Sequence, residues 1–287
     1  MVSTRLPDPT TVQPTEVLRT NDYSEGPVVD RSGNLYFSHG QTITRIAPDG
    51  SAIDWAQTHA PNGHKILLNG EHLVCDGRRH AVLRLGAQGQ ELGVAASGHV
   101  GELTILTPND LTLDPEGGFY FSDSVPETGA VFFVSEEGAK QLVAGNIDFA
   151  NGVTLSADRR RLYVAESLRN RILVIDLEAP GVAAGPPRLL ADLPRNLERP
   201  GPEWNQPDGM ALDLEGRLWV AHYGMRAVHV LSPEGQLLRT YDGGNVTTSN
   251  VCFGGPAFDQ LYVTGGEPGA LFRLDVGVPG LPLLPAA

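Results

Sequence analysis

One stretch of this chain predicts its fold: Pro207-Asp208-Gly209-Met210-Ala211-Leu212-Asp213-Leu214-Glu215-Gly216-Arg217-Leu218-Trp219-Val220-Ala221. Apolar residues alternate with smaller or polar ones up to Leu214, which is typical of a half-buried strand. Gly216 then supplies a turn, because glycine adopts positive φ angles without a steric cost. The apolar run from Leu218 to Ala221 predicts a second strand, so the whole stretch is expected to be a β-hairpin.

The second strand of this hairpin recurs through the chain. Six similar segments stand at residues 33–39, 70–76, 117–123, 160–166, 216–222 and 259–265. Each is followed by a third strand-like segment, at residues 42–46, 81–85, 130–134, 171–175, 227–231 and 270–274. A fourth follows in most repeats, as at residues 141–144 and 237–240. Four-stranded units repeated about every 40 residues are typical of β-propellers, so the sequence predicts an all-β, six-bladed β-propeller.

The two ends of the chain indicate how the ring of blades closes. The sixth repeat runs out after Leu274 into a proline-rich tail, which cannot supply a good central strand. The strand-like segment 16–20 is spare, so we expect it to form the outer strand of the last blade. One domain then spans residues 1–287, with tails at about 1–14 and 276–287. Tandem immunoglobulin-like sandwiches are the competing all-β fold, but no linker between two domains is visible.

Composition narrows the class of protein. The net charge of −13 at pH 7 argues against a nucleic-acid partner. No segment approaches the ~20 apolar residues of a membrane span, and the N-terminus lacks an apolar leader, so we expect a cytoplasmic protein that binds no membrane. Cys75 and Cys252 lie in apolar runs, which favours buried free thiols, although a disulfide stays open. We expect a monomer or a small homo-oligomer.

In a propeller the first strand of each blade lines a central channel. Here these strands are expected to begin at Glu25, near His64-Lys65, and at Asn109, Asn151, Asp208 and Asn250. Because strands one and two are antiparallel, each second strand ends at the rim where the first begins. Polar residues therefore gather at one mouth of the channel. Behind the channel residues we expect His39, Asp76, Asp123, Glu166 and His222.

The residues expected at this mouth form a set of hard oxygen donors. Glu25 and Asp208 supply carboxylates, and Asn109 and Asn151 supply amide oxygens. Such donors suit Ca²⁺, Mg²⁺ or Mn²⁺, and two carboxylates balance the charge of a dication. Each residue alone also fits a simple turn, but their equivalent positions in successive repeats favour a metal site.

Four of these segments resemble one known family. Residues 24–27, 108–114, 151–156 and 207–213 are similar to motifs of the gluconolactonase, senescence marker protein-30 and luciferin-regenerating enzyme family, and residues 250–255 match its last-blade pattern. The resemblance implies a six-bladed propeller with one divalent cation in the channel. It implies Glu25, Asn151 and Asp208 as metal ligands, Asn109 as a substrate contact, and Asp208 as acid or base. Ca²⁺ is the expected cofactor, with Mg²⁺, Mn²⁺, Zn²⁺ or Fe²⁺ as alternatives.

The predicted function is metal-assisted hydrolysis of a small-molecule lactone or related ester, with Asp208 as the base. Family members often have an aromatic residue after Glu-Gly-Pro and a basic residue before Pro-Asn-Asp. This chain instead has Val28, Val29 and the apolar segment 103–107. These differences leave room for a less polar ester or lactone than a sugar lactone. The alternatives are an organophosphate (phosphotriester) hydrolase on the same metal, and a non-catalytic propeller that binds calcium or a protein partner.

Six residues around the mouth are candidate substrate contacts: Asn109, His39, His222, Arg78, Arg226 and Trp204. The two histidines titrate near neutral pH, so they are either proton carriers or hydrogen-bonded structural groups. The two arginines, with Arg79 and Arg169 nearby, either hold a substrate carboxylate or remain solvated. The tryptophan stands in a predicted loop, residues 194–206, where it covers the pocket or anchors the loop. A second predicted loop, residues 179–187, lies away from this mouth.

Overall fold

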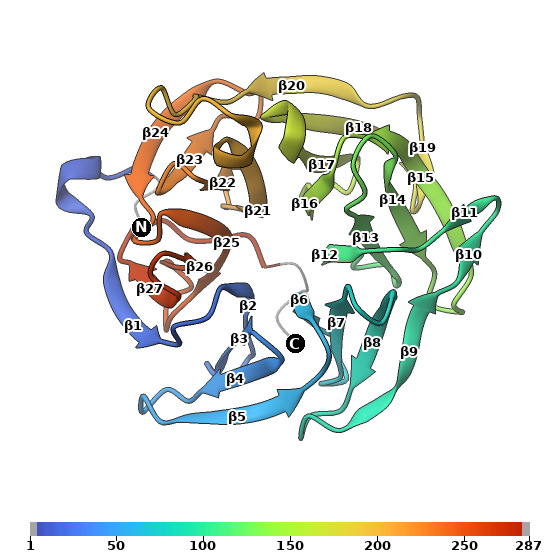
Figure 1. Cartoon of the computed structure of the whole chain (residues 1–287), viewed down its shortest axis with the longest axis horizontal. Coiled ribbons are helices and arrows are strands. Elements are labelled where there is room, and N and C mark those ends of the chain that lie inside the picture. Colours follow the sequence, from blue (N-terminus) through green and yellow to red (C-terminus); the bar gives the residue numbers. More distant parts are fainter. Residues whose placement is uncertain (1–4, 283–287) are drawn as a thin grey trace.

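The computed structural model describes residues 5–282. Short antiparallel strands dominate this range, and its helices are the 3-10 turns η1 (Pro9–Thr11), η2 (Ser167–Arg169) and η3 (Pro202–Trp204). The strands are arranged around a common centre (Figure 1). The chain is therefore an all-β protein, as the sequence predicts.

The strands pair in sequence order into antiparallel units (Figure 1). One unit contains β2 (Ser24–Val29), β3 (Leu35–His39), β4 (Thr42–Ile46) and β5 (Ala52–Gln57). The next contains β6 (Pro61–Ile66), β7 (His72–Asp76), β8 (Ala81–Leu85) and β9 (Glu91–Ser97). It is followed by β12 (Pro108–Leu113), β13 (Phe119–Asp123), β14 (Gly129–Val134) and β15 (Lys140–Ile147). The unit after that contains β16 (Ala150–Leu155), β17 (Arg161–Glu166), β18 (Arg171–Ala179) and β20 (Arg188–Asp192).

The remaining strands form one larger sheet. It contains β21 (Gln206–Leu212), β22 (Leu218–Tyr223), β23 (Ala227–Leu231) and β24 (Leu237–Asp242), followed by β25 (Thr247–Gly254), β26 (Gln260–Gly266) and β27 (Ala270–Leu274). A single residue pair, Tyr223 with Thr247, joins these two groups of strands. The N-terminal strand β1 (Thr15–Arg19) pairs with β27, so strands from opposite ends of the chain lie side by side (Figure 1).

Two short additions lie outside this pattern. β10 (His99–Val100) pairs with β11 (Leu103–Thr104) between β9 and β12. β19 (Val182–Ala183) pairs with the end of β18, inside the segment that the sequence predicts as a loop. The prediction of a loop over residues 179–187 is therefore wrong where these strands lie. The buried side chain of Leu177 fixes the end of β18 in the core, and β18 stays extended as far as Ala179.

The strand register places equivalent residues at the start of each innermost strand. Ser24 pairs with His39, Pro61 with Asp76, Pro108 with Asp123, Ala150 with Glu166, Pro207 with His222 and Thr248 with Gly265. The next residues along the chain are Glu25, Asn62, Asn109, Asn151, Asp208 and Ser249.

Two of the predicted strand starts are therefore wrong. β6 begins at Pro61, ahead of His64-Lys65, and Asn250 lies one residue past the position equivalent to Glu25. Proline is tolerated as the first residue of a strand, which hides the start of β6 in the sequence. Each innermost strand also carries a β-bulge that shifts the alternation of its side chains, and a simple strand pattern does not reveal it.

Glycines let the innermost strands approach one another closely. A Cβ atom on Gly152 would lie 2.1 Å from the backbone oxygen of Asp208, and one on Gly26 would lie 2.0 Å from that of Asn62. Only glycine fits such a contact between backbones. As a result β2 lies beside β6 and β25, β12 beside β6 and β16, and β21 beside β16 and β25.

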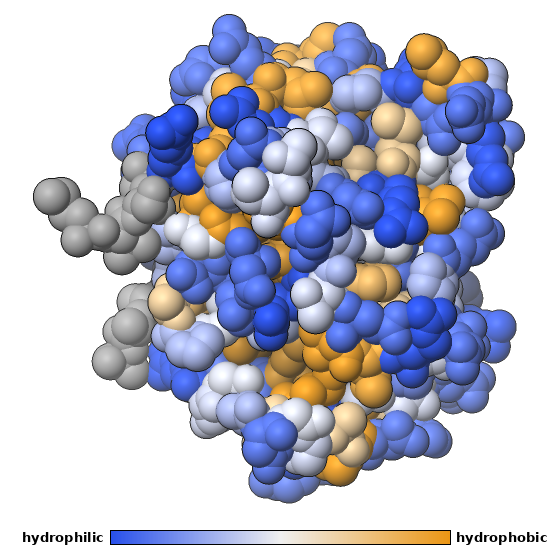
Figure 2. Space-filling model, turned by 90° about the vertical axis from the view of Figure 1, so that its left-hand side faces the viewer, coloured by the Kyte–Doolittle hydropathy of each residue, from blue (hydrophilic) through white to orange (hydrophobic). Residues whose placement is uncertain are grey.

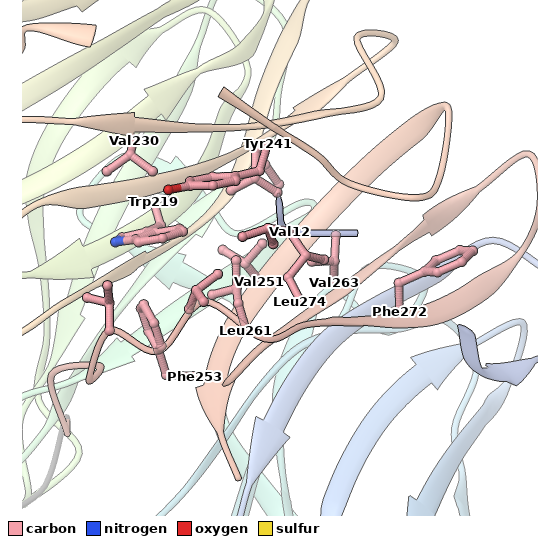
Figure 3. Packing of buried hydrophobic residues seen from close by; sticks show 14 of the residues in the cluster. Val12, Trp219, Val230, Tyr241, Val251, Phe253, Leu261, Val263, Phe272 and Leu274 are labelled. Atoms are coloured by element: carbon pink, nitrogen blue, oxygen red, sulfur yellow. The ribbon is translucent and has the colours of Figure 1, made fainter. Parts of the chain in front are cut away.

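Hydrophobic side chains fill the space between neighbouring units. Trp219 stacks on Tyr241 with ring centroids 5.4 Å apart, and meets Phe253 edge-on at 5.5 Å (Figure 3). Val12 of the N-terminal segment joins the same cluster, and the Tyr241 hydroxyl donates to the carbonyl of Pro7 at 2.9 Å. Full burial of a Phe-sized side chain stabilises a fold by about 1.5–3 kcal/mol. The described part of the predicted N-terminal tail is thus packed against the sheet.

The C-terminal segment crosses the face opposite the start of β21. Gly280 pairs with Asp213 in the turn after β21, and the N–H of Leu281 donates to the carbonyl of Leu212 at 2.8 Å. Val276 and Val278 are buried. The remainder of the predicted tails, residues 1–4 and 283–287, lies outside the described residues.

The side of the molecule in Figure 2 is mostly hydrophilic, with hydrophobic side chains in separate patches. Within residues 5–282 no helix has the length and apolar character needed to cross a membrane. Both cysteines are free thiols, as predicted; Cys75 is buried and Cys252 is half-buried. Burial raises the pKa of Cys252 to about 12.

Candidate functional site

Two acidic side chains meet where the innermost strands begin. Glu25 of β2 and Asp208 of β21 are each only 5% exposed. The hydroxyl of Tyr23 lies 3.2 Å from Oε1 of Glu25 and 3.5 Å from Oδ2 of Asp208. One hydroxyl hydrogen serves one acceptor at a time, so the two carboxylates share this donor. The structure therefore brings the predicted acidic pair together around a phenol that no sequence pattern identifies.

The surroundings of this pair disfavour two negative charges. Burial, and then the carboxylate of Asp110, raise the pKa of Glu25 to about 7. Burial, and then the charges of Glu25 and Asp110, raise the pKa of Asp208 well above its ordinary value. Buried carboxylates with raised pKa values are neutralised either by protons or by a positive ion. The pair is thus suited to hold a cation.

A third carboxylate, Asp110 of β12, lies deeper and is 1% exposed. Its Oδ1 is 3.9 Å from Nζ of Lys65, and its Oδ2 accepts from the N–H of Val153 at 3.3 Å. Burial raises the pKa of Asp110, while Lys65 opposes that rise. Sequence reasoning missed both residues. One feature of the sequence could have identified Asp110. It occupies the position at which most innermost strands have a glycine, as β2 does with Gly26.

The amide of Asn151 has an unsatisfied oxygen. Asn151 of β16 is buried, and within residues 5–282 its Oδ1 has no hydrogen-bond partner. The close contact of Gly152 with the backbone of Asp208 holds β16 beside β21. An unpaired buried oxygen of this kind costs about 1–3 kcal/mol unless a ligand satisfies it. Asn109 stands at the equivalent position, second in β12, and is half-buried.

These donors fit a hard divalent cation. The described residues contain no group of three or more His, Cys, Asp or Glu side chains placed to hold a metal ion. A site here therefore needs amide oxygens in addition to the carboxylates of Glu25 and Asp208, and Asn151 offers one. Ca²⁺ and Mg²⁺ bind oxygen donors, including sites that have few charged ligands and leave coordination positions open.

The two candidate histidines are engaged by the outer strands of their own units. Nδ1 of His222 lies 2.9 Å from Nε2 of His229, and burial, followed by His229, lowers the pKa of His222 well below its ordinary value. Nε2 of His39 lies 2.8 Å from Oγ1 of Thr44, and burial lowers its pKa as well. These contacts favour neutral imidazoles, and they do not link either ring to Glu25 or Asp208. Within residues 5–282 Nε2 of His222 is buried without a hydrogen-bond partner, so His222 stays a candidate substrate contact.

The acidic residues at the ends of the second strands fasten loops. The carboxylate of Asp76 accepts from the N–H groups of His59, Arg78 and Arg79 at 2.8–3.1 Å. Glu166 accepts from the N–H of Asp148 at 2.9 Å. These side chains therefore shape the mouth without reaching into it.

Most of the candidate arginines lie at the surface in ion pairs. Nε of Arg226 is 2.8 Å from Oδ1 of Asp242, and Nε of Arg169 is 2.9 Å from Oδ2 of Asp148. Arg78, in the turn after β7, is exposed. Exposed pairs of this kind contribute about 0–1 kcal/mol and leave the guanidinium partly occupied.

Trp204 belongs to a row of aromatic rings at the mouth. Its ring centroid is 6.4 Å from that of Tyr223, which is 6.1 Å from that of Tyr23. The structure thus connects Trp204, through Tyr223, to the phenol that contacts both carboxylates. Sequence reasoning missed the two tyrosines because single aromatics at strand ends carry no pattern.

Comparison with known proteins shows what this chain is similar to. The profile of the SMP-30/Gluconolactonase/LRE-like region family matches residues 23–267. The chain is 31% identical to lactonase drp35 of Staphylococcus saprophyticus, over 92% of this chain and 84% of that protein. It is 26% identical to regucalcin of Xenopus laevis, over 88% of this chain and 86% of that protein. A solved structure of a calcium-binding regucalcin from Agrobacterium tumefaciens is 19% identical and has the same fold, with a TM-score of 0.77 over 94% of this chain and 96% of that chain.

Proposed function

Because the chain belongs to the SMP-30/gluconolactonase/LRE-like family, we propose that it is a divalent-metal-dependent hydrolase of lactones or related esters. One observation carries this proposal: Glu25 and Asp208, two buried carboxylates with raised pKa values, share the hydroxyl of Tyr23, and the strand of Asp208 lies beside β16, which carries the unsatisfied amide oxygen of Asn151. The similarity to a lactonase over most of both chains supports the choice of reaction.

The residues divide into holding and reacting roles. Glu25, Asn151 and Asp208 would hold the cation, which when bound polarises a carbonyl and stabilises the developing negative charge. Asp208 would accept the proton of the attacking water at Oδ2, the carboxylate oxygen that faces Tyr23. Asn109, less buried than Asn151, would orient the substrate. Calcium is the first choice of metal because every proposed ligand is a hard oxygen.

His39 and Arg226 have no direct role in this proposal, because Thr44 and Asp242 hold their side chains. His229 holds only Nδ1 of His222, and Nε2, which has no partner among residues 5–282, is left for contact with the substrate.

We also propose the finer architecture, a single six-bladed propeller closed by β1. Support comes from the neighbours of the innermost strands, each of which lies beside two others, and from the pairing of β1 with β27. A cytoplasmic location is supported by the two free thiols, Cys75 and Cys252.

The test combines binding and turnover. Calcium titrated into chelator-treated protein should bind one equivalent by calorimetry and raise the melting temperature, and Asn151→Leu should weaken that binding. A panel of lactones, esters and phosphotriesters is then assayed with and without chelator. Chelation without effect on either activity or melting would overturn the metal site. Turnover of phosphotriesters alone, or calcium binding with no turnover, would replace the proposal with a phosphotriester hydrolase or a non-catalytic calcium protein.

A further inference from the structure

A row of aromatic rings begins at the two carboxylates. Tyr23, Tyr223 and Trp204, which we call the aromatic wall, follow one another with ring centroids 6.1 and 6.4 Å apart. We propose that the aromatic wall binds an apolar aryl or alkyl substituent of the substrate, which makes the preferred substrates substituted, hydrophobic lactones or esters. This inference rests on the hydrolase function proposed above.

The orientation of Tyr23 links the wall to the reacting groups. Its hydroxyl contacts Glu25 and Asp208, yet the residue as a whole is 43% exposed. The polar tip therefore points to the carboxylates while the apolar ring remains open to a ligand. A carbonyl group that reaches Asp208 would carry its substituent across this ring. Aromatic contacts of this kind contribute through both buried area and ring geometry.

Trp204 is a fixed part of the wall. The guanidinium of Arg199 lies 4.2 Å from its ring centroid, and the side-chain amide of Asn205 donates to the carbonyls of Arg199 and Gly201 at 3.0 and 2.8 Å. A Cβ on Gly224 would lie 2.3 Å from the backbone oxygen of Trp204, so the loop is fitted against a glycine with a φ of +82°. A ring held in this way binds a substituent without a further ordering cost.

A further exposed apolar side chain stands just ahead of one innermost strand. Leu106, just before β12, is 43% exposed, and its N–H donates to both oxygens of Asp123 at 3.1 Å. In Figure 1, β12 lies across the centre from β25, whose neighbour β21 follows the loop that carries Trp204. Arg226 and Arg169 are occupied by surface carboxylates. Apolar contact is therefore the recognition that the Trp204 side of this mouth offers.

The first experiment compares substrates on the full-length, calcium-loaded protein. δ-Valerolactone, δ-phenyl-δ-valerolactone and glucono-1,5-lactone share a six-membered lactone ring and differ in their substituents. We expect the kcat/KM of the phenyl-substituted lactone to exceed those of the other two by about tenfold or more. If none of these lactones and none of the esters in the panel above is hydrolysed, the proposed function fails. If lactones are hydrolysed but glucono-1,5-lactone or δ-valerolactone is equal or preferred, only the aromatic-wall inference fails.

The second experiment assigns the preference to the wall. Trp204→Ala should lower the ratio of kcat/KM for the phenyl-substituted lactone over δ-valerolactone by about tenfold, mostly through KM. Gly224→Ala should lower the ratio in the same direction by displacing the ring. Leu197→Ala, in the same loop and 90% exposed, is the matched control and should leave the ratio unchanged. A ratio that survives both of the first two changes overturns the inference.

Binding without turnover supplies an independent readout. The lactam analogue 6-phenylpiperidin-2-one resists hydrolysis, so its dissociation constant can be measured by tryptophan fluorescence or calorimetry. We expect it to bind at least tenfold more tightly than piperidin-2-one, and Trp204→Phe to abolish the fluorescence change while retaining most of the affinity. If Trp204→Ala proves unfolded, Trp204→Phe and Tyr223→Leu replace it. Equal binding of the two lactams would refute a hydrophobic subsite.

Discussion

Replacing Gly152 with alanine is a direct test of how the innermost strands set the site. The new Cβ would lie 2.1 Å from the backbone oxygen of Asp208 and 2.8 Å from Cα of Gly209, well inside the 3.4 Å at which ordinary contact begins. Both facing groups belong to strand β21, so no flexible side chain can move aside. β16 and β21 must therefore separate, which strains the strand pairing on both sides.

The size of the effect follows from overpacking. Extra methyl groups in a packed core lower the free energy of unfolding by about 1–3 kcal/mol. The atoms in contact here are backbone atoms that cannot move aside, so we expect a loss of about 3 kcal/mol. For a chain of this size each kcal/mol shifts the melting temperature by about 2–4 °C, so we expect a fall of about 6–12 °C. Calcium affinity should fall as well, because the change separates Asn151 from Asp208.

Thermal denaturation followed by circular dichroism measures the first effect, and calorimetric calcium titration the second. Gly185→Ala is the matched control, because Gly185 is exposed and nothing lies within 4 Å of its added Cβ. If Gly152→Ala melts within 1 °C of Gly185→Ala and binds calcium equally well, the close packing of β16 on β21 does not set the site.

Asp208→Asn should lower kcat by about 10²–10⁴-fold without lowering the melting temperature, since it removes a base and one of two repelling charges; a variant with near wild-type kcat contradicts that role. In chelated protein the melting temperature should fall as pH rises from 4.5 to about 7. The pKa of Glu25 is about 7 in the folded state against an ordinary 4.5, so in this range the folded state retains a proton that the unfolded state has released. Calcium should consequently raise the melting temperature more at pH 8 than at pH 5, and an equal rise at both would count against the assignment. Tyr241→Phe should lower the free energy of unfolding by about 0.5–1.5 kcal/mol through the lost hydrogen bond to Pro7. The loss should vanish in a protein that lacks residues 1–8; if the effects of the substitution and the truncation simply add, the bond to Pro7 is not its cause.

The repeat made most of the strands predictable. Segments such as residues 33–39 and 216–222 each contain a short apolar run after a turn residue, and the structure has β3 and β22 there. The pairing of β1 with β27 also agrees with a spare strand-like segment at residues 16–20. Local pattern fails where a proline or a bulge sets the start of a strand, as at Pro61 and Asn250, because register depends on the partner strand.

The candidate site was only partly predictable. Glu25 and Asp208 could be placed together because repeat position alone puts them at one end of their strands. Tyr23 and Asp110 could not, because their roles come from contacts with residues far away in the chain. The histidines and arginines illustrate the opposite case: their chemistry suits a site, yet His222 and Arg226 contact neighbours that lie outside the acidic pair.

The pairing of β1 with β27 has a consequence for how the protein is made. Thr15 pairs with Arg273, so one of the first strands to leave the ribosome has its partner among the last. Until β27 has been made, the edge of β1 that pairs with it is a free template for another chain, and exposed strand edges promote aggregation and strand exchange. A nascent chain is therefore most vulnerable just before release. Two copies that exchange β1 would form a linked dimer with every native strand contact preserved.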